Sequence, residues 1–258
     1  TEVECATSLF FQEFVYGIPY VHWSFDKLEN GGFEADGTMP GASAYRAELR
    51  HMDKAAQDFD TSGCQVGGRF GEAFAMDGKG LFAQTAFPGM AWDTPRTFTA
   101  WVRHREDFGS ERTPYCAWGR RPSYGKSWKI MFWKRARGYQ LCTSAFGPAW
   151  ESPIKDDFLN EWVHVASVYT GRKDKAGRVE MRHYINGVLQ PTVVVDPKTE
   201  SISVNTDTSE KATRVRFGAG VSAKEGNHTV DGDLDEVYLF RGVLSEKQIR
   251  QLMNTNRL

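Results

Sequence analysis

The sequence has 258 residues, of which 40% are hydrophobic, and its 32 basic and 33 acidic side chains leave a net charge of −1. This balance gives no net attraction to nucleic acid or to an anionic membrane, so we expect no nucleic-acid partner. No apolar run reaches the roughly 18 residues that a transmembrane helix needs, and no transmembrane segment is predicted.

Two segments before residue 65 do not follow a strand pattern. Residues 1–20 are expected to form an extra strand or an arm. Residues 43–59 combine good helix formers with Leu49, Met52 and Ala56 at helical spacing, which predicts a helical insertion or an irregular loop.

Short aromatic and β-branched runs separated by Gly, Pro, Asn and Asp fill the chain after residue 65, as in an antiparallel sandwich. The first run alternates, with Phe98, Ala100 and Val102 on the face that suits a core. Asn186-Gly187 is a strong signal for a hairpin with a type I′ turn. The predicted strands lie within residues 96–105, 127–134, 138–146, 161–169 and 179–187.

A short helix is predicted at the C-terminus. Ser245 is placed as its N-cap, Gln248 as the capping-box partner, and Leu244 can pack against Ile249 as a hydrophobic staple. We therefore predict an all-β fold of two antiparallel sheets with a short C-terminal helix. No repeat or polar linker divides the chain, so residues 1–258 are expected to form a single domain, and the initial Thr1 suggests a processed protein or a module of a larger one.

The four cysteines are too scattered for a disulfide scaffold or a thiolate metal site, and either two disulfides or buried free thiols remain open. Cys116 and Cys142 lie in predicted strands with one strand between them, which would separate them by roughly 9–10 Å. Cys5 with Cys64 is then the better candidate pair.

An ordered series of motifs carries a resemblance to a known family. Together the motifs resemble the laminin-G-like jelly roll of the concanavalin A-like lectin/glucanase superfamily over about residues 22–256. The resemblance implies a jelly-roll sandwich of two stacked antiparallel sheets. The motifs are HWSFD at 22–26, GRFGEAFAMDGKG at 68–80, FTAWVR at 98–103, EWVHVASVYTG at 161–171, YING at 184–187 and DGDLDEVYLFRGVLSEKQI at 231–249.

Enzymes also occur on this fold, so we examined two catalytic patterns. The acidic run from Asp231 to Glu236 lacks the paired glutamates of a retaining glucanase. Residues 46–50, Arg-Ala-Glu-Leu-Arg, resemble a motif of jelly-roll alginate lyases, but the required downstream motifs are missing, and we interpret these charges as an exposed helix face. Neither pattern predicts an enzyme.

Calcium is the one cofactor for which the sequence offers ligands. Asp231, Asp233 and Asp235 have the initial spacing of an EF-hand loop, but the required Gly and final Glu are absent. Laminin-G-like domains often bind Ca²⁺ between loops and sheet ends, and the resemblance implies that Asp26 and Asp235 face one another as metal ligands. Plain solvated carboxylates are the alternative.

Aromatic residues make up 13% of the chain, and a few of them have basic neighbours in positions that suit a ligand. Flat rings beside polar side chains are typical of carbohydrate sites. Packing between the two sheets is the alternative for each ring. The strand phases place six candidate ligand-binding residues together on one sheet: Trp101, Arg103, Trp118, Arg120, Lys129 and Trp133.

These observations favour a non-catalytic recognition module outside the cytoplasm, which binds carbohydrate or a glycosylated or protein partner. A polysaccharide-active hydrolase or lyase is the first alternative. A structural or adhesive domain without a small ligand is the second.

Overall fold

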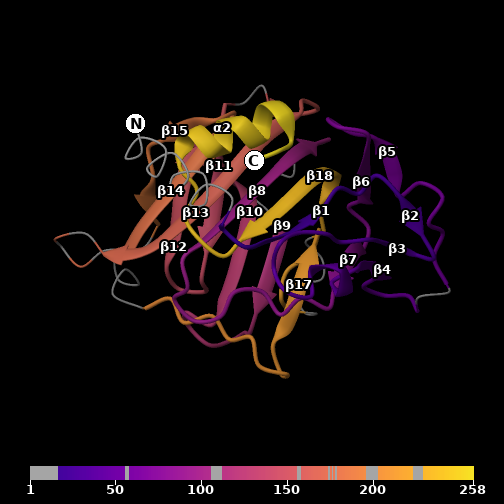
Figure 1. The fold of residues 1–258 in the computed structure, drawn as a ribbon, viewed down its shortest axis with the longest axis horizontal. Helices are drawn as coiled ribbons and strands as arrows, with labels where there is room; N and C mark the ends of the chain where they lie inside the picture. The colour runs from indigo at the N-terminus through magenta and orange to yellow at the C-terminus, as the bar shows by residue number, and fades with distance from the viewer. Residues whose placement is uncertain are drawn as a thin grey trace, which may run out of the picture.

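The structure is a computed structural model that describes residues 17–55, 58–105, 112–155, 158–173, 175, 177, 179–195, 203–222 and 229–258. These residues form two antiparallel sheets and a C-terminal helix (Figure 1). The predicted all-β sandwich is confirmed.

The first sheet has eight strands in the described part of the chain, with β1 (Tyr20–Trp23) paired to β18. Its long central pair is β13 with β8, from Val163 opposite Val102 to Tyr169 opposite Arg96. In order across the sheet, the other strands are β15 (Val188–Gln190), β14 (Val179–Ile185), β13 (Val163–Lys173), β8 (Arg96–His104), β18 (Asp231–Phe240), β6 (Glu72–Asp77) and β5 (Gln65–Gly67).

The second sheet has ten strands within the same described ranges. Strands β9, β10 and β11 form a meander, so Cys116 and Cys142 lie on strands separated by β10. The order is β16 (Val193–Val194), β12 (Ala149–Pro153), β11 (Gly138–Ser144), β10 (Ser127–Arg135), β9 (Arg112–Gly119), β17 (Thr213–Phe217), β7 (Leu81–Thr85), β4 (Ala47–His51), β3 (Gly32–Phe33) and β2 (Leu28–Glu29).

The core lies between the sheets because alternate residues of each strand turn inward. Phe98, Ala100 and Val102 of β8 are all buried in it, as predicted. Trp23 and Trp128 are also among its fully buried members. Core packing therefore accounts for a large part of the aromatic content of the chain.

The predicted turn and cap are also present. Asn186 and Gly187 have φ values of 49° and 72°, as a type I′ turn between β14 and β15 requires. Helix α2 (Glu246–Thr255) begins with a capping box in which the Ser245 side chain accepts from the Gln248 backbone. Ile249 of the helix and Leu244 before it belong to a second cluster on the outer face of the first sheet, which α2 covers (Figure 1).

The predicted helical insertion at 43–59 is wrong. Its centre is strand β4, which pairs with β3 and β7, and the preceding Ala42–Ala44 form a single 3₁₀ turn. Ala47 and Leu49 enter the core, so the period of two prevails over local helix propensity.

The ends and thiols of the chain are described only in part. Cys5 and residues 1–16 lie outside the described residues, so the pairing of Cys5 with Cys64 stays a prediction. Cys64 is buried, and this burial, with the charges of Asp77 and Asp60, raises the pKa of its thiol to about 11. Within the described ranges, no helix is long and apolar enough to cross a membrane.

Candidate functional site

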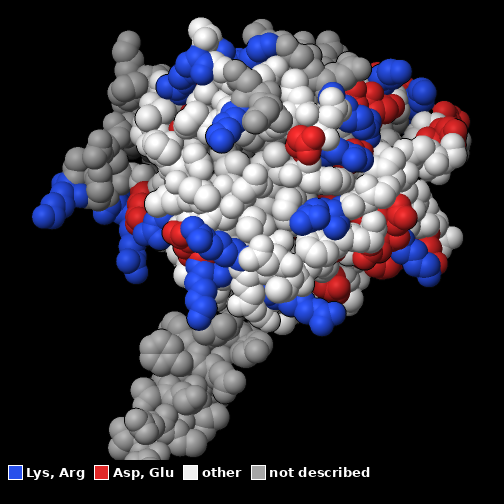
Figure 2. Space-filling model, turned by 90° about the horizontal axis from the view of Figure 1, so that it is seen from above, with Lys and Arg blue, Asp and Glu red and all other residues white. Residues whose placement is uncertain are grey.

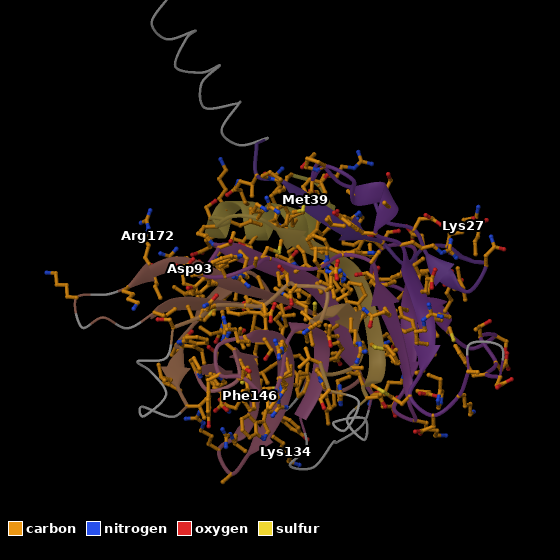
Figure 3. The ribbon with its side chains drawn as sticks, turned by 90° about the horizontal axis from the view of Figure 1, so that it is seen from below. Lys27, Met39, Asp93, Lys134, Phe146 and Arg172 are labelled. Carbon is orange, nitrogen blue, oxygen red and sulfur yellow. The ribbon has the colours of Figure 1, made fainter. Side chains whose placement is uncertain are left out.

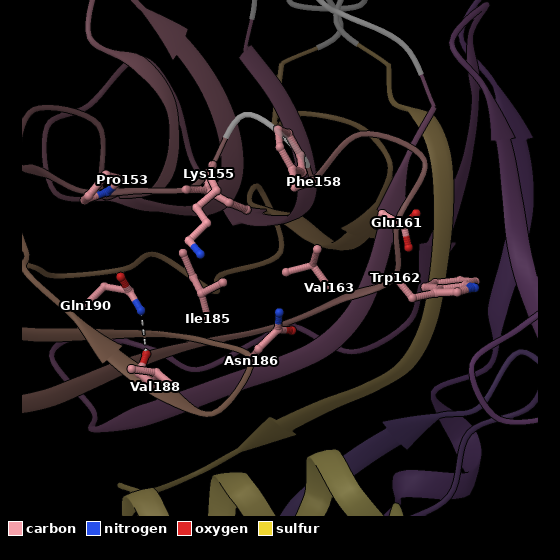
Figure 4. Close-up of a pocket in the computed structure, with 11 residues that line it drawn as sticks. Pro153, Lys155, Phe158, Glu161, Trp162, Val163, Ile185, Asn186, Val188 and Gln190 are labelled. Carbon is pink, nitrogen blue, oxygen red and sulfur yellow. Dashed lines mark hydrogen bonds between the residues drawn. The ribbon is translucent and has the colours of Figure 1, made fainter.

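A pocket of about 540 Å³ lies where the connection between β12 and β13 passes the β14–β15 hairpin (Figure 4). This volume is within the roughly 300–1,000 Å³ of small-ligand sites. Its apolar lining includes Ile154, Phe158, Val163 and Ile185.

Polar side chains from both segments also line the pocket. The Lys155 ammonium and the Glu161 carboxylate have no hydrogen bond or ion pair with another described side chain. Asn186 Oδ1 accepts from the backbone of His164 at 2.9 Å, and Gln190 Nε2 donates to the Val188 carbonyl at 3.0 Å. Figure 4 shows Lys155 extending over Ile185. An opposite pair of charges beside an apolar wall suits a neutral, hydroxyl-rich ligand.

Trp162 forms one end of the pocket and connects it to the first sheet. The Arg103 guanidinium lies over its ring, 4.8 Å from the centroid, and Arg103 Nε donates to Asp233 at 2.7 Å. Arg105 binds Asp231 at 2.8 Å and also binds Asp233. The Trp162 ring is therefore held from one side by a fixed ion-pair network.

The six predicted ligand-binding residues do not form one site. Trp101 and Arg103 belong to the first sheet, whereas Lys129 and Trp133 belong to the second. Trp101 is covered, with the Arg69 guanidinium 5.0 Å from its ring centroid. The prediction that the six line one sheet is wrong, and of these residues only Arg103 adjoins the pocket through Trp162.

The prediction that Trp118 faces a ligand is also wrong. This residue is fully buried in the core, and its Nε1 donates to the Met90 carbonyl at 3.2 Å. A bulge at Tyr115 shifts the phase of β9, since Ile130 faces Cys116 while Met131 faces Pro114. Arg120 follows this strand, with its Nη1 3.7 Å from Asp207.

The remaining two candidates lie on the outer face of the second sheet. Lys129 is buried there, and Trp133 is half-buried with the Arg135 guanidinium 3.3 Å from its ring centroid. Arg135 lines a smaller pocket of about 430 Å³ together with Arg137. Both arginines bind the buried Glu151, which offsets part of the local positive charge.

The two predicted calcium ligands bind the same loop. Asp235 Oδ2 accepts from the backbone N–H groups of Arg69 and Phe70 at 2.7 and 3.0 Å, and Asp26 Oδ1 accepts from that of Glu72 at 2.9 Å. Burial raises the pKa of Asp235 to about 7 against these hydrogen bonds, with a contribution from the charges of Glu236 and Asp26.

This loop offers only part of a calcium site. Asp235 Oδ1 is buried and has no hydrogen-bond partner among the described residues, which would suit a cation. Ca²⁺ takes six to eight oxygen ligands, however, and the described residues contain no group of three His, Cys, Asp or Glu side chains that could hold a metal ion. Calcium binding therefore stays a prediction.

If Ca²⁺ does bind here, millimolar CaCl₂ should raise the melting temperature of the protein and EDTA should reverse the rise, because a ligand of the folded state stabilises it. Differential scanning fluorimetry measures the shift. Asp235→Asn should abolish it. Equal melting temperatures of the wild type in CaCl₂ and in EDTA would remove the calcium prediction.

The residues that line the pocket at Trp162 were not found from the sequence. Lys155 and Glu161 lie in an irregular connection, and Asn186 and Gln190, which line the same pocket, lie some distance along the chain. No local motif links the two segments, and the one signal was a tryptophan, Trp162, beside Glu161 at the start of a strand.

Comparison with known proteins gives one family and several similar structures. The family model "Concanavalin A-like lectin/glucanases superfamily" matches residues 77–250. No curated protein sequence matches the chain significantly.

Three solved structures show the same fold at low identity. Domain 4 of AbnA, an extracellular arabinanase from Geobacillus stearothermophilus solved with arabinotriose, has 16% identity and a TM-score of 0.59, with 92% of this chain and 98% of that chain covered. The binding domain of Paraclostridial Mosquitocidal Protein 1 has 13% identity and a TM-score of 0.56, over 94% and 53%. A Trypanosoma rangeli sialidase solved with 2,3-difluorosialic acid has 13% identity and a TM-score of 0.53, over 92% and 33%.

Proposed function

Because the chain belongs to the concanavalin A-like lectin/glucanases superfamily, we propose that it is a non-catalytic module that binds an oligosaccharide in the pocket beside Trp162. The observation that carries the proposal is that Lys155 and Glu161, whose charged groups bind no other described side chain, lie next to an apolar wall. Such a mixture can contact both the hydroxyl groups and the apolar faces of a sugar.

The similar structures support this proposal in two ways. The AbnA domain was solved with arabinotriose, and it is nearly fully covered by this chain. AbnA is an extracellular arabinanase, and the similar part of the mosquitocidal protein is its binding domain. These neighbours support the proposal that the chain acts outside the cytoplasm as a module of a larger protein, with a carbohydrate or a glycosylated partner as its ligand.

The distribution of charge also suits a neutral ligand. Figure 2 shows basic and acidic side chains interspersed over the face that it presents, with uncharged surface between them. A surface that attracts nucleic acid would carry a continuous basic patch. The mixed surface leaves local contacts to select the ligand.

Replacing Lys155 and Glu161 by alanine should weaken oligosaccharide binding by on the order of tenfold or more for each variant, because a hydrogen bond to a charged group contributes about 1.5–3 kcal/mol. Isothermal titration calorimetry with arabinotriose, and with any hit from a glycan array, measures the loss. Lys247→Ala, an exposed lysine on α2, is the matched control. Unchanged affinity in both pocket variants would move the site elsewhere.

The hydrolase and lyase alternatives have less support from the geometry. Asp231 and Asp233 are bound by arginines, and Asp235 by backbone N–H groups, whereas retaining hydrolysis needs two carboxylates about 5–5.5 Å apart at a substrate. An assay for new reducing ends or unsaturated uronates after incubation with the bound polysaccharide distinguishes an enzyme from a binding module.

The lyase-like residues lie on a strand and not on the exposed helix that we expected. Alternate residues of a strand share a face, so Arg46, Glu48 and Arg50 point the same way from β4 and its flank. Arg50 binds Glu48, and Arg46 binds Glu34. Both arginines are thus engaged by carboxylates of the chain itself.

A structural or adhesive domain without a small ligand remains the other alternative. It differs from the proposal in one measurable respect, since such a domain would bind no glycan on an array.

A further inference from the structure

Trp92 is the most exposed large hydrophobic residue that the structure describes, with 69% of its surface accessible. It lies in the loop between β7 and β8, and its φ of 60° is in the left-handed region that a bulky residue rarely adopts. An exposed ring in a strained backbone adds little to the stability of the fold. Strain of this kind is often retained where a residue has a function.

A buried arginine fixes this strained loop. Arg96, which is 1% exposed, donates to the carbonyls of Trp92 at 2.8 Å, Met90 at 3.0 Å and Thr94 at 2.8 Å. The Trp92 backbone also exchanges two hydrogen bonds with Thr206, at 2.8 and 3.0 Å. The indole therefore projects from a rigid support, which lowers the entropy cost of binding a ligand.

A second exposed ring belongs to the same backbone network. Tyr124, 62% exposed, stacks on Phe146 with ring centroids 5.1 Å apart. The next residue, Gly125, accepts a hydrogen bond from Asn205, which precedes the Thr206 that binds Trp92. We call Trp92, Tyr124 and the 203–207 segment between them the aromatic rim. Figure 3 labels a neighbour of each ring, Asp93 next to Trp92 and Phe146, on which Tyr124 stacks, and Asp93 lies on the side of the molecule away from Lys27.

Polar groups lie along the aromatic rim. Asp93 follows Trp92, and Asp207 lies 3.7 Å from Arg120, whose side chain is half exposed. Protein interfaces usually have a contiguous apolar centre, whereas here two rings are separated by polar segments. The charges at the rim are mixed, because Arg120 and Lys126 lie near Asp207 and the Arg121 guanidinium lies 4.1 Å from the Phe146 ring centroid. Separate flat rings with polar groups between them match a chain of sugar rings.

We propose that the aromatic rim is a second carbohydrate-binding surface, on which Trp92 and Tyr124 stack against the sugar rings of a polysaccharide chain and Arg96 acts as a positioning residue. This inference rests on the proposed function of the domain as a carbohydrate-binding module. It assigns to Trp92 a role separate from that of the pocket at Trp162.

Affinity electrophoresis in gels that contain linear arabinan, or the polysaccharide of the best array hit, tests the proposal. Trp92→Ala and Tyr124→Ala should each weaken the retardation by on the order of tenfold, because each removes the burial of an aromatic face. Val193→Ala, which truncates another exposed hydrophobic residue at 44% exposure, should leave it unchanged. Equal melting temperatures of the variants show that the fold is intact.

This experiment tests the aromatic rim and the pocket at Trp162 separately. Wild-type retardation in Trp92→Ala and Tyr124→Ala, with a loss in the Lys155 and Glu161 variants, overturns the aromatic rim and leaves the pocket. The opposite pattern supports the rim and overturns the pocket. If the wild type shows no retardation and the array gives no hit, both sites are overturned. If the protein instead sediments with phosphatidylserine vesicles and this depends on Trp92, the aromatic rim binds a membrane and the proposal is also overturned.

Discussion

Arg96→Leu should lower the free energy of unfolding by roughly 3–5 kcal/mol, because it removes three hydrogen bonds to carbonyl groups and takes a buried cation away from its aromatic neighbours. The Trp92 and Met90 carbonyls each keep one other donor, from Thr206 and Trp118. The guanidinium carbon lies 4.7 Å from the Trp128 ring centroid and 5.4 Å from that of Tyr169. Leucine retains part of the volume but makes none of these polar contacts.

Urea denaturation followed by tryptophan fluorescence measures this loss. Arg96→Lys keeps the charge without the planar fork that reaches several carbonyls, so we expect it to recover only part of the stability. Arg172→Ala, at an exposed position on β13, is the control and should change the free energy by less than about 0.5 kcal/mol. A loss below about 1 kcal/mol in Arg96→Leu would show that Arg96 does not stabilise the loop of residues 90–94 as we expect.

His22→Gln should remove a pH-dependent part of the stability. His22 is buried, with Nδ1 3.0 Å from Asp36 and Nε2 2.5 Å from the buried Glu236, and its ring stacks on Tyr238 with centroids 4.0 Å apart. Burial lowers the pKa of His22, but hydrogen bonds to Asp36 and Glu236 and the charges of both outweigh it and raise the pKa from 6.5 to about 9.

The direction of the pH effect follows from that rise. The folded state binds the proton more tightly than the unfolded state, so the stabilisation is complete below pH 6.5 and is lost as the pH rises through about 9. A rise of this size corresponds to roughly 3 kcal/mol. The wild type should therefore lose this amount relative to His22→Gln between pH 6.5 and about pH 10.

Urea denaturation of both proteins across this pH range isolates the contribution of His22. The variant His22→Gln alone leaves the Glu236 carboxylate buried without its cation, so the double variant H22Q/E236Q serves as the neutral reference. The difference between the wild type and the double variant should shrink with rising pH. A difference independent of pH would mean that His22 is neutral in the folded protein.

Much of the fold could be predicted because local signals and tertiary packing agree. The alternation in β8, the Asn186-Gly187 turn and the capping box of Ser245 each specify a structure within a few residues. The helical insertion predicted over residues 43–59 is wrong because β4 pairs with β3 and β7. Pairing between distant segments leaves no local pattern in the sequence.

The candidate site could be predicted far less well. Strand phase indicates on which face a side chain lies, but not which sheet contains the strand or what covers it. The bulge at Tyr115 reversed the expected orientation of Trp118, and Arg69 covers Trp101 from a loop far away in the sequence. One sequence feature could have pointed to Trp92 as an exposed residue. It is a tryptophan in a Gly- and Pro-containing segment outside any alternating run.

The central claim is that the chain is a carbohydrate-binding module with Lys155 and Glu161 in its binding pocket, and a glycan array tests it most directly. Labelled wild type and the double variant K155A/E161A are applied side by side at equal concentration. We predict that the wild type binds a group of related glycans and that the double variant loses most of this signal. A wild type that binds no glycan, or a double variant that binds the same glycans equally well, would contradict the claim.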